Sequence, residues 1–198
     1  MKKVLLLILV LVALLAIWGV KVYNGLVTNQ ENVERAVGNV QTAYQKRADL
    51  IPNLVATVKN YAEYEANTQI AVVEARAKAA GSITIDPTNL TEESLNAYLN
   101  AQNELSGALK NLLVTVEQYP DLKANQNYLN LQDQLESCEN GIANARREFN
   151  ETAMAYNTNV RKFPGNIIAG MFGFAEKPYF KAADGAEQVP DVGDLFNN

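Results

Sequence analysis

The side chains best suited to chemistry in this sequence are one thiol, several charged pairs and nine tyrosines, because the chain has no histidine. Histidine is the commonest general base and the commonest metal ligand, so both roles lose their usual residue. Cys138 falls on the apolar face of a helical pattern, where burial raises the pKa of a thiol and leaves it inert. A single cysteine also cannot form an internal disulfide. We therefore expect Cys138 to be structural.

The charged pairs favour structural roles over catalysis. Arg47 and Asp49 flank an expected helix corner, where they would interact with the ends of two helix dipoles. A binding role for this pair is the alternative. Arg146 and Arg147 lie beside Glu148 and suit surface ion pairs. Because no pattern resembles a nucleophile with its base, a phosphate loop or a metal cluster, the sequence predicts no enzyme, no cofactor and no small-molecule substrate.

The overall charge argues against nucleic-acid binding. The net charge is −5, acids and bases are interspersed, and basic residues form no run longer than two. Binding to nucleic acid normally requires a concentrated positive face. We expect no nucleic-acid partner.

The N-terminal segment has the composition of a membrane anchor. Residues 4–20 are uncharged and consist largely of Leu, Val, Ile and Ala, with Trp18 and Tyr23 at the far end. A helix over these residues is about 26 Å long, and the next three residues bring it near the ~30 Å hydrocarbon core. The alternative is a cleaved signal peptide, but no Ala-x-Ala triplet follows the apolar run. We predict an uncleaved anchor over residues 1–23 that crosses the lipid bilayer once.

The flanking charges indicate an orientation. Lys2 and Lys3 precede the apolar run, whereas only Lys21 follows it before Arg35. The positive-inside rule then favours a cytoplasmic N-terminus. We expect a membrane protein whose body lies outside the cytoplasm.

The remaining chain shows the periodicity of long amphipathic helices. The residue before Pro52 is disfavoured in a helix, so we expect a first helix to end near Arg47 and a second to begin at Pro52. Thr91 is suited to cap a third helix, and Asp121 a fourth. Short corners between long helices make neighbours antiparallel. The sequence thus predicts an all-α fold, a four-helix up-and-down bundle over residues 24–162, with helices near 24–47, 52–80, 92–118 and 122–160.

Two features qualify this bundle. A three-helix version remains open if the chain runs through Pro52 with only a kink. The fourth helix carries the clearest coiled-coil pattern, with apolar or small residues alternating three and four apart from Tyr128 to Tyr156. Tyrosines near this and the other helix seams are expected to fill the core, namely Tyr44, Tyr61, Tyr64, Tyr98, Tyr128 and Tyr156.

The C-terminal tail, residues 163–198, begins with an apolar stretch where a simple tail would be polar. A cluster of this many apolar side chains is unfavourable in water. We therefore expect these side chains to pack on the bundle, enter a membrane interface or contact another copy. From Asp184 onward the chain is acidic and contains several Gly and Pro residues, so we expect it to be flexible. The candidate interaction and assembly residues are Phe163, Pro164, Ile167, Ile168, Met171, Phe172, Phe174, Tyr179 and Phe180.

Several ordered motifs between the anchor and about residue 181 resemble those of the LemA family of bacterial membrane-anchored helical proteins. They are YNGLV at 23–27, RADLIPNLV at 47–55, VKNYA at 58–62 with Glu65, EAR at 74–76, EQYPDLK at 117–123, NARR at 144–147, YN at 156–157 and FPGNI at 163–167. The resemblance implies a single-pass membrane protein with a four-helix bundle, and it brings no reaction, cofactor or substrate. Residue 64 is Tyr where family members often have His, so no role of that histidine applies here.

Three classes of function follow. The leading hypothesis is a membrane-anchored structural or scaffolding protein that forms homo-oligomers through residues 163–180. The second is an adaptor or sensor that binds another membrane or envelope protein through exposed helices of mixed charge. The third, an enzyme, would need a carboxylate or tyrosine site that no recognised pattern reveals.

Overall fold

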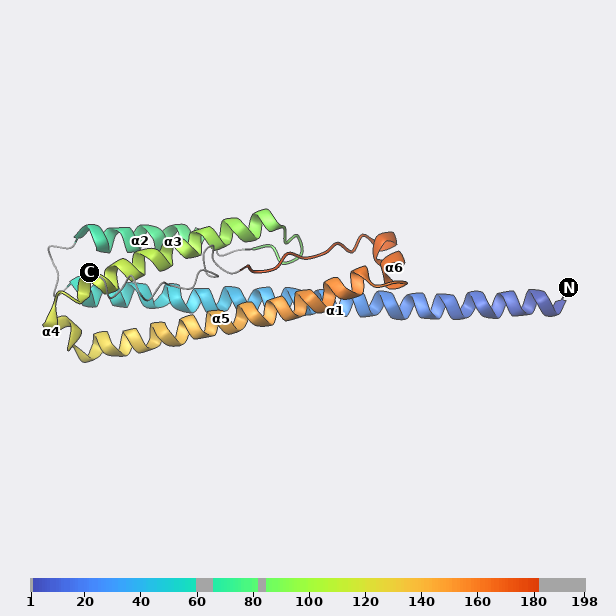
Figure 1. The fold of residues 1–198 in the computed structure, drawn as a ribbon, viewed down its shortest axis with the longest axis horizontal. Helices are drawn as coiled ribbons and strands as arrows, with labels where there is room; N and C mark the ends of the chain where they lie inside the picture. The colour runs from blue at the N-terminus through green and yellow to red at the C-terminus, as the bar shows by residue number, and fades with distance from the viewer. Residues whose placement is uncertain (1, 60–65, 82–84, 182–198) are drawn as a thin grey trace, which may run out of the picture.

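The computed structural model describes residues 2–59, 66–81 and 85–181, and these residues form helices and connections without any strand (Figure 1). The predicted all-α class is therefore confirmed over this part of the chain. The expected tyrosines Tyr61 and Tyr64, and the acidic stretch from Asp184 onward, lie outside the described residues. The helices are α1 (Lys2–Lys59), α2 (Ala66–Gly81), α3 (Glu92–Val116), α4 (Pro120–Lys123), α5 (Gln126–Arg161) and α6 (Gly165–Phe172).

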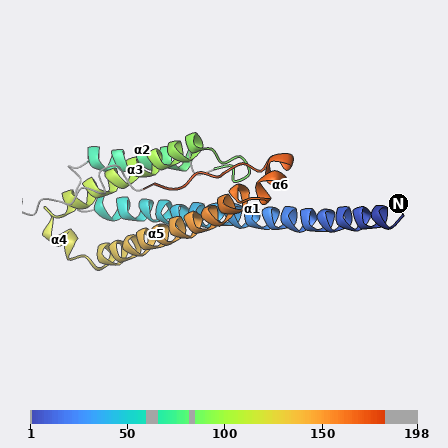
Figure 2. The same ribbon diagram turned by 45° about the vertical axis from the view of Figure 1, so that its right-hand side comes forward.

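Helix α1 contains the apolar N-terminal segment and the first helix of the body in one unbroken element. Its 58 residues correspond to a rod about 87 Å long. The apolar end projects alone beyond the other helices (Figures 1 and 2), and its side chains are exposed. Among the described residues, α1 is the helix with a segment long and apolar enough to cross a bilayer.

The corner predicted between Arg47 and Pro52 is wrong, because α1 continues through Pro52 to Lys59. A proline inside a helix removes a hydrogen bond and costs about 3 kcal/mol. Here Ile51, Leu54 and Val58 are all fully buried on the same side of α1. Burial of a large aliphatic side chain contributes about 2 kcal/mol, so three of them outweigh the local penalty. The expected second helix is consequently divided between the end of α1 and α2.

Helices α1 and α5 lie side by side and run in opposite directions. Asn39 contacts Glu148, and Arg47 contacts Glu139, so the pairing moves backward along α5 as it moves forward along α1. Helix α2 packs against α3, and Lys78 forms an ion pair with Glu104 across that contact. Helix α2 also packs against α1, which joins the two pairs (Figure 2).

The buried apolar residues form two clusters along the body. The first lies nearer the apolar end of α1 and combines α1, α5 and the start of α3 with α6 and the C-terminal segment. The second lies at the far end and combines the end of α1 with α2, α3, α4 and the start of α5. Arg47, Gln102 and other polar groups lie between the two clusters. The core is therefore interrupted by a polar layer.

The helix starts follow capping chemistry, with one correction. Thr91 caps α3 as predicted, and its side chain accepts a hydrogen bond from the Ser94 N–H at 3.1 Å. The predicted cap Asp121 is wrong, because Tyr119 precedes the short helix α4 and Pro120 is its first residue. The long helix α5 begins later, and the Asn125 side chain caps it by accepting from two backbone N–H groups.

Replacing Thr91 by Ala should lower the free energy of unfolding by about 1 kcal/mol, because the α3 start loses a side-chain acceptor for its free N–H groups. Thermal unfolding of the full chain in detergent, followed by circular dichroism, measures the change. Thr42→Ala is the matched control, since Thr42 is an exposed residue within α1. Equal stability of the two variants would contradict a capping role.

Candidate functional site: the C-terminal segment and the buried polar layer

The C-terminal segment begins with α6, which packs against α1 where α1 leaves the body (Figure 1). The centroid of the Tyr23 ring lies 4.8 Å from the centroid of the Phe172 ring and 5.7 Å from that of Phe174. Ile168 packs over Gly19, where an added Cβ would lie 3.7 Å from the isoleucine Cδ1. Helix α6 therefore lies beside the last turns of the apolar segment.

The structure divides the nine candidate assembly residues into two groups. Phe180 is buried, and Ile168 and Phe174 are half-buried against the first apolar cluster. These three residues contact the body of the same chain. The others remain exposed, namely Phe163, Pro164, Ile167, Met171, Phe172 and Tyr179.

Residues 174–181, which we call the strap, leave α6 at Gly173 and run back along α5. Gly173 has a φ of 76°, a left-handed conformation that glycine adopts without a Cβ clash. Asn157 binds both backbone groups of Lys177, accepting from its N–H and donating to its carbonyl, each at 2.8 Å. Asn150 binds Phe180 in the same way, at 2.8 and 2.9 Å. Two amides seven residues apart on α5 thus hold the strap by its main chain.

An aromatic pocket fixes the end of the strap. The Phe180 ring packs against Phe149 with their centroids 4.9 Å apart in a T-shaped arrangement. The Arg146 guanidinium carbon lies 5.2 Å from the Phe180 centroid, and Nη2 of Arg146 donates to the Lys181 carbonyl at 2.8 Å. Stacking, cation–π attraction and a hydrogen bond therefore converge on Phe180.

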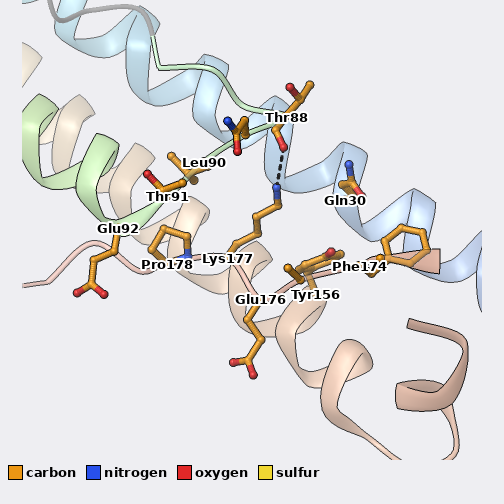
Figure 3. A pocket seen from close by; sticks show the side chains of 13 residues that line it. Gln30, Thr88, Leu90, Thr91, Glu92, Tyr156, Phe174, Glu176, Lys177 and Pro178 are labelled. Carbon is orange, nitrogen blue, oxygen red and sulfur yellow. Dashed lines mark hydrogen bonds between the residues drawn. The ribbon is translucent and has the colours of Figure 1, made fainter. Parts of the chain in front are cut away.

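Two lysines of the strap reach across to the start of α3 and to the connection that precedes it. Nζ of Lys177 donates to the Thr88 carbonyl at 3.2 Å (Figure 3). Nζ of Lys181 lies 2.6 Å from Oε1 of Glu92, and this hydrogen bond and charge lower the pKa of the Glu92 carboxyl. Between strap, connection and α5 lies an open pocket, with Tyr156 on its α5 side. The strap thus bridges α5 and the start of α3.

The buried polar layer is organised by Arg47, which is only 1% exposed. Its Nη1 donates to Ser106 at 2.8 Å and to Glu139 at 2.9 Å. Its Nη2 donates to the side-chain oxygen of Gln102 at 2.7 Å and to the Gln102 carbonyl at 3.2 Å. The guanidinium carbon also lies 5.0 Å from the Tyr44 ring centroid. One side chain of α1 therefore connects α3 to α5.

Burial dominates the electrostatics of this layer. Desolvation raises the pKa of the Tyr98 hydroxyl. It also raises the pKa of Tyr44, although the positive charges of Arg146 and Arg47 partly oppose that shift. Within the described part of the chain, three buried polar atoms have no hydrogen-bond partner: Nε of Arg47, the Tyr98 hydroxyl and Nε2 of Gln102. The arrangement is suited to joining helices, since the buried guanidinium is paired with the Glu139 carboxylate and is otherwise enclosed by neutral polar and aromatic side chains.

Cys138 lies outside the core, contrary to the expected seam position. It is half-buried in a shallow pocket beside Lys46 and Glu148. Partial burial still raises its pKa, as predicted, so the thiolate is disfavoured. The described residues also bring together no group of three or more His, Cys, Asp or Glu side chains that could hold a metal ion.

Sequence reasoning missed the three residues that organise these sites. Asn150 and Asn157 have the character of ordinary polar helix residues, although their spacing of seven places them on one face of α5. The sequence predicts Arg47 at a helix end, whereas its burial inside α1 follows from the absence of the expected corner. Arg47 and Asn157 both fall in motifs of the family resemblance, which gives them no individual role.

Comparison with known proteins places the chain in a family. The model of the LemA family matches residues 36–193, which include the polar layer and the whole strap. The chain is 28% identical over 174 residues to the magnetosome protein MamQ of Magnetospirillum gryphiswaldense, covering 80% of this chain and 64% of MamQ. It is 27% identical over 175 residues to MamQ 2 of Paramagnetospirillum magneticum, with the same coverage.

A second kind of relative carries the family's own name. The protein LemA of Metamycoplasma hominis is 25% identical over 174 residues, which cover 88% of this chain and 75% of that protein. The chain spans less than two thirds of the MamQ proteins but a larger share of this relative. Since the family model covers most of the chain, from the body of α1 to beyond the strap, this protein belongs to the LemA family.

Proposed function

We propose that this protein is a membrane-anchored, non-enzymatic scaffold that self-associates through its C-terminal apolar segment. The observation that carries the proposal is the strap, a segment held on the body by side-chain contacts to its main chain and by one aromatic pocket. The division into an anchor (1–23), a bundle (24–162) and a tail (163–198) forms part of the proposal. We also propose that the long helices form one antiparallel up-and-down bundle. The opposed directions of α1 and α5 support this.

The continuity of α1 supports the anchoring role. Leu26, six residues beyond the apolar run, is fully buried in the body, and Val33 is buried two turns after it. A cleavage site after the run would therefore lie within a helix that is packed a turn or two later. Signal peptidase cleaves accessible chain after small residues, which suits this arrangement poorly. The N-terminal charges favour a body outside the cytoplasm of a bacterial cell.

A structural role is also supported by the chemistry of the buried groups. Among the described residues, Arg47 is the most buried charged side chain, and it is engaged with Gln102, Ser106 and Glu139 of neighbouring helices. The tyrosines beside it have raised pKa values, so they remain protonated at neutral pH. These groups join helices, and their enclosure leaves little access for a substrate. The names of the family and of the relatives refer to no reaction.

Self-association can use the strap in trans. The strap follows a glycine hinge at Gly173, and its binding groups, Asn150, Asn157 and the Phe149 pocket, are present on every copy. A strap released from its own α5 can therefore bind the same site on a neighbour with the same contacts. Exchange of an identical segment between copies is a low-cost route to oligomers.

The mass of the detergent-extracted full chain tests this proposal. We expect an oligomer for the full chain and for a version ending at Lys181, and a monomer for a version ending at Gly173, which keeps α6 and loses the strap. Asn150→Ala combined with Asn157→Ala should weaken the oligomer without shortening the chain. An oligomer that persists without the strap would contradict exchange, and a monomeric full chain would favour the alternative, an adaptor that binds another envelope protein.

A further inference from the structure

Helix α6 has an apolar face that the rest of the described chain leaves uncovered. Met171 is 73% exposed, and Ile167 and Phe172 are more than half exposed. Ile167 and Met171 are four residues apart, so they lie on the same side of the helix. Phe163 precedes the helix and is 81% exposed. The opposite side, with Ile168 and Ala169, packs on the body.

The sequence of α6 differs from that of a helix built to face water. Its eight residues contain no charged side chain, and Asn166 is its one polar side chain. A helix lying on a soluble body normally presents charged or polar residues on its outer face. Here Ile167 and Met171 are exposed with no charged residue of α6 beside them, so an apolar environment on the outer side would stabilise the helix.

The position of α6 along α1 identifies that environment. Its contacts to α1 are made by Gly19, Val22 and Tyr23. These residues end the apolar run, where a helix begun near residue 4 has risen about 26 Å and reaches the far edge of a ~30 Å hydrocarbon core. Trp18 and Tyr23 are of the two types that concentrate at this boundary.

The charges around α6 suit lipid headgroups. Lys162 directly precedes the apolar residues and is exposed, and Lys21 is exposed on α1 at the same level. Cations beside an apolar helical face are characteristic of helices that lie in the interface of a bilayer with anionic lipids. A second copy of the chain could cover the face as well, but lipid already surrounds α1 at this height.

We propose that Phe163 and the outer face of α6 insert into the lipid interface beside the anchor, so that the chain contacts the bilayer at two points. The inserted side chains are Phe163, Ile167 and Met171, whereas Phe172 lies four residues after Ile168 on the side that contacts Tyr23. This inference requires the bilayer anchoring of α1 and is independent of self-association by the strap.

Fluorescence quenching in vesicles of phosphatidylcholine and phosphatidylglycerol tests this insertion. In the full chain, Cys138→Ser removes the native thiol and Met171→Cys introduces a single new one. This new cysteine is labelled with an environment-sensitive nitrobenzoxadiazole probe. Lipids with a nitroxide near the start of the acyl chain should quench this probe about twofold, and aqueous iodide should quench it little. Met154→Cys is the matched control, since Met154 is 58% exposed on α5 within the body. The control probe should respond to iodide and not to the lipid nitroxide.

The remaining outcomes overturn the proposal. Quenching of the Met171 probe by iodide to the same extent as the Met154 probe would place α6 in water. Shielding of the Met171 probe from both quenchers would show that protein covers the face instead. Ile167→Cys, one turn earlier, should repeat the Met171 pattern, which guards against a local disturbance by one label. Circular dichroism and the elution volume in detergent establish that each labelled variant is folded.

Discussion

Replacing Arg47 by Ala is expected to lower the free energy of unfolding by about 3 kcal/mol. The change removes a fully buried side chain, leaves a cavity, and deprives Gln102 and Ser106 of the guanidinium that they contact. Arg47→Lys keeps the charge but lacks the planar fork that reaches α3 and α5 together, so we expect about two thirds of that loss. Denaturant unfolding of the full chain in detergent, followed by circular dichroism, measures both changes.

Two further variants separate packing from charge at this position. Arg47→Met fills most of the space without a buried charge, and it should restore stability to within about 1.5 kcal/mol of the unaltered chain. Arg35→Ala is the control, because Arg35 is exposed on the same helix, and it should change stability by less than about 0.5 kcal/mol. A change at Arg47→Ala as small as at Arg35→Ala would mean that the polar layer contributes nothing to the fold.

Replacing Phe180 by Ala should release the strap while the helices stay folded. Replacing a buried Phe by Ala costs about 3 to 5 kcal/mol. Here this cost lowers the free energy that holds the eight residues of the strap on the body. Hydrogen exchange reports it directly, because the N–H groups of Lys177 and Phe180 donate to Asn157 and Asn150. A loss of about 3 kcal/mol corresponds to roughly 100-fold faster exchange at these two amides.

The neighbouring residue provides the control for this prediction. Tyr179 is 41% exposed, and Tyr179→Ala removes an aromatic ring of similar size from the solvent side of the strap. Exchange at the Lys177 and Phe180 amides should then change by less than about threefold. If Phe180→Ala left both amides protected, the Asn contacts alone would hold the strap, and the aromatic pocket would be dispensable.

The parts of the fold that depend on local pattern could be predicted from the sequence. The apolar run and the Thr91 cap are set by residues close together in the chain, and both occur as expected. The seam of the fourth helix is also correct at most positions, including the fully buried Phe149 and Tyr156. Cys138 departs from it because it faces a shallow pocket at the edge of the helix contact.

Pro52 shows where local preference fails. The steric rule for proline acts on one turn, whereas the burial of Ile51, Leu54 and Val58 depends on α2, α3 and α5. A single sequence contains the first signal and does not contain the second. The same limit hid Arg47, since arginine is almost never fully buried and its partners lie 55 to 92 residues away.

The composition of the C-terminal segment predicts that it is covered but does not predict by what. Its apolar content indicates that it does not remain in water, and it is compatible with the bundle, a membrane interface or another copy. The structure assigns Phe180 to the body, and it leaves Met171 and its neighbours exposed beside the apolar end of α1. The two amides that make the difference, Asn150 and Asn157, bind main-chain atoms, so the sequence of the strap carries little trace of them.

Because α1 is unbroken, its apolar N-terminal segment and its part in the body form one rigid rod. Membrane helices tilt when the hydrocarbon thickness around them changes. The 37 residues from Tyr23 to Lys59 extend about 54 Å, so a tilt of about 10° at the bilayer carries the far tip sideways by roughly 9 Å. A jointed linker at the membrane surface would absorb such a tilt, whereas this helix transmits it along its whole length. With α1 anchored as proposed, bilayer thickness and curvature would therefore influence the position of the far end of the protein.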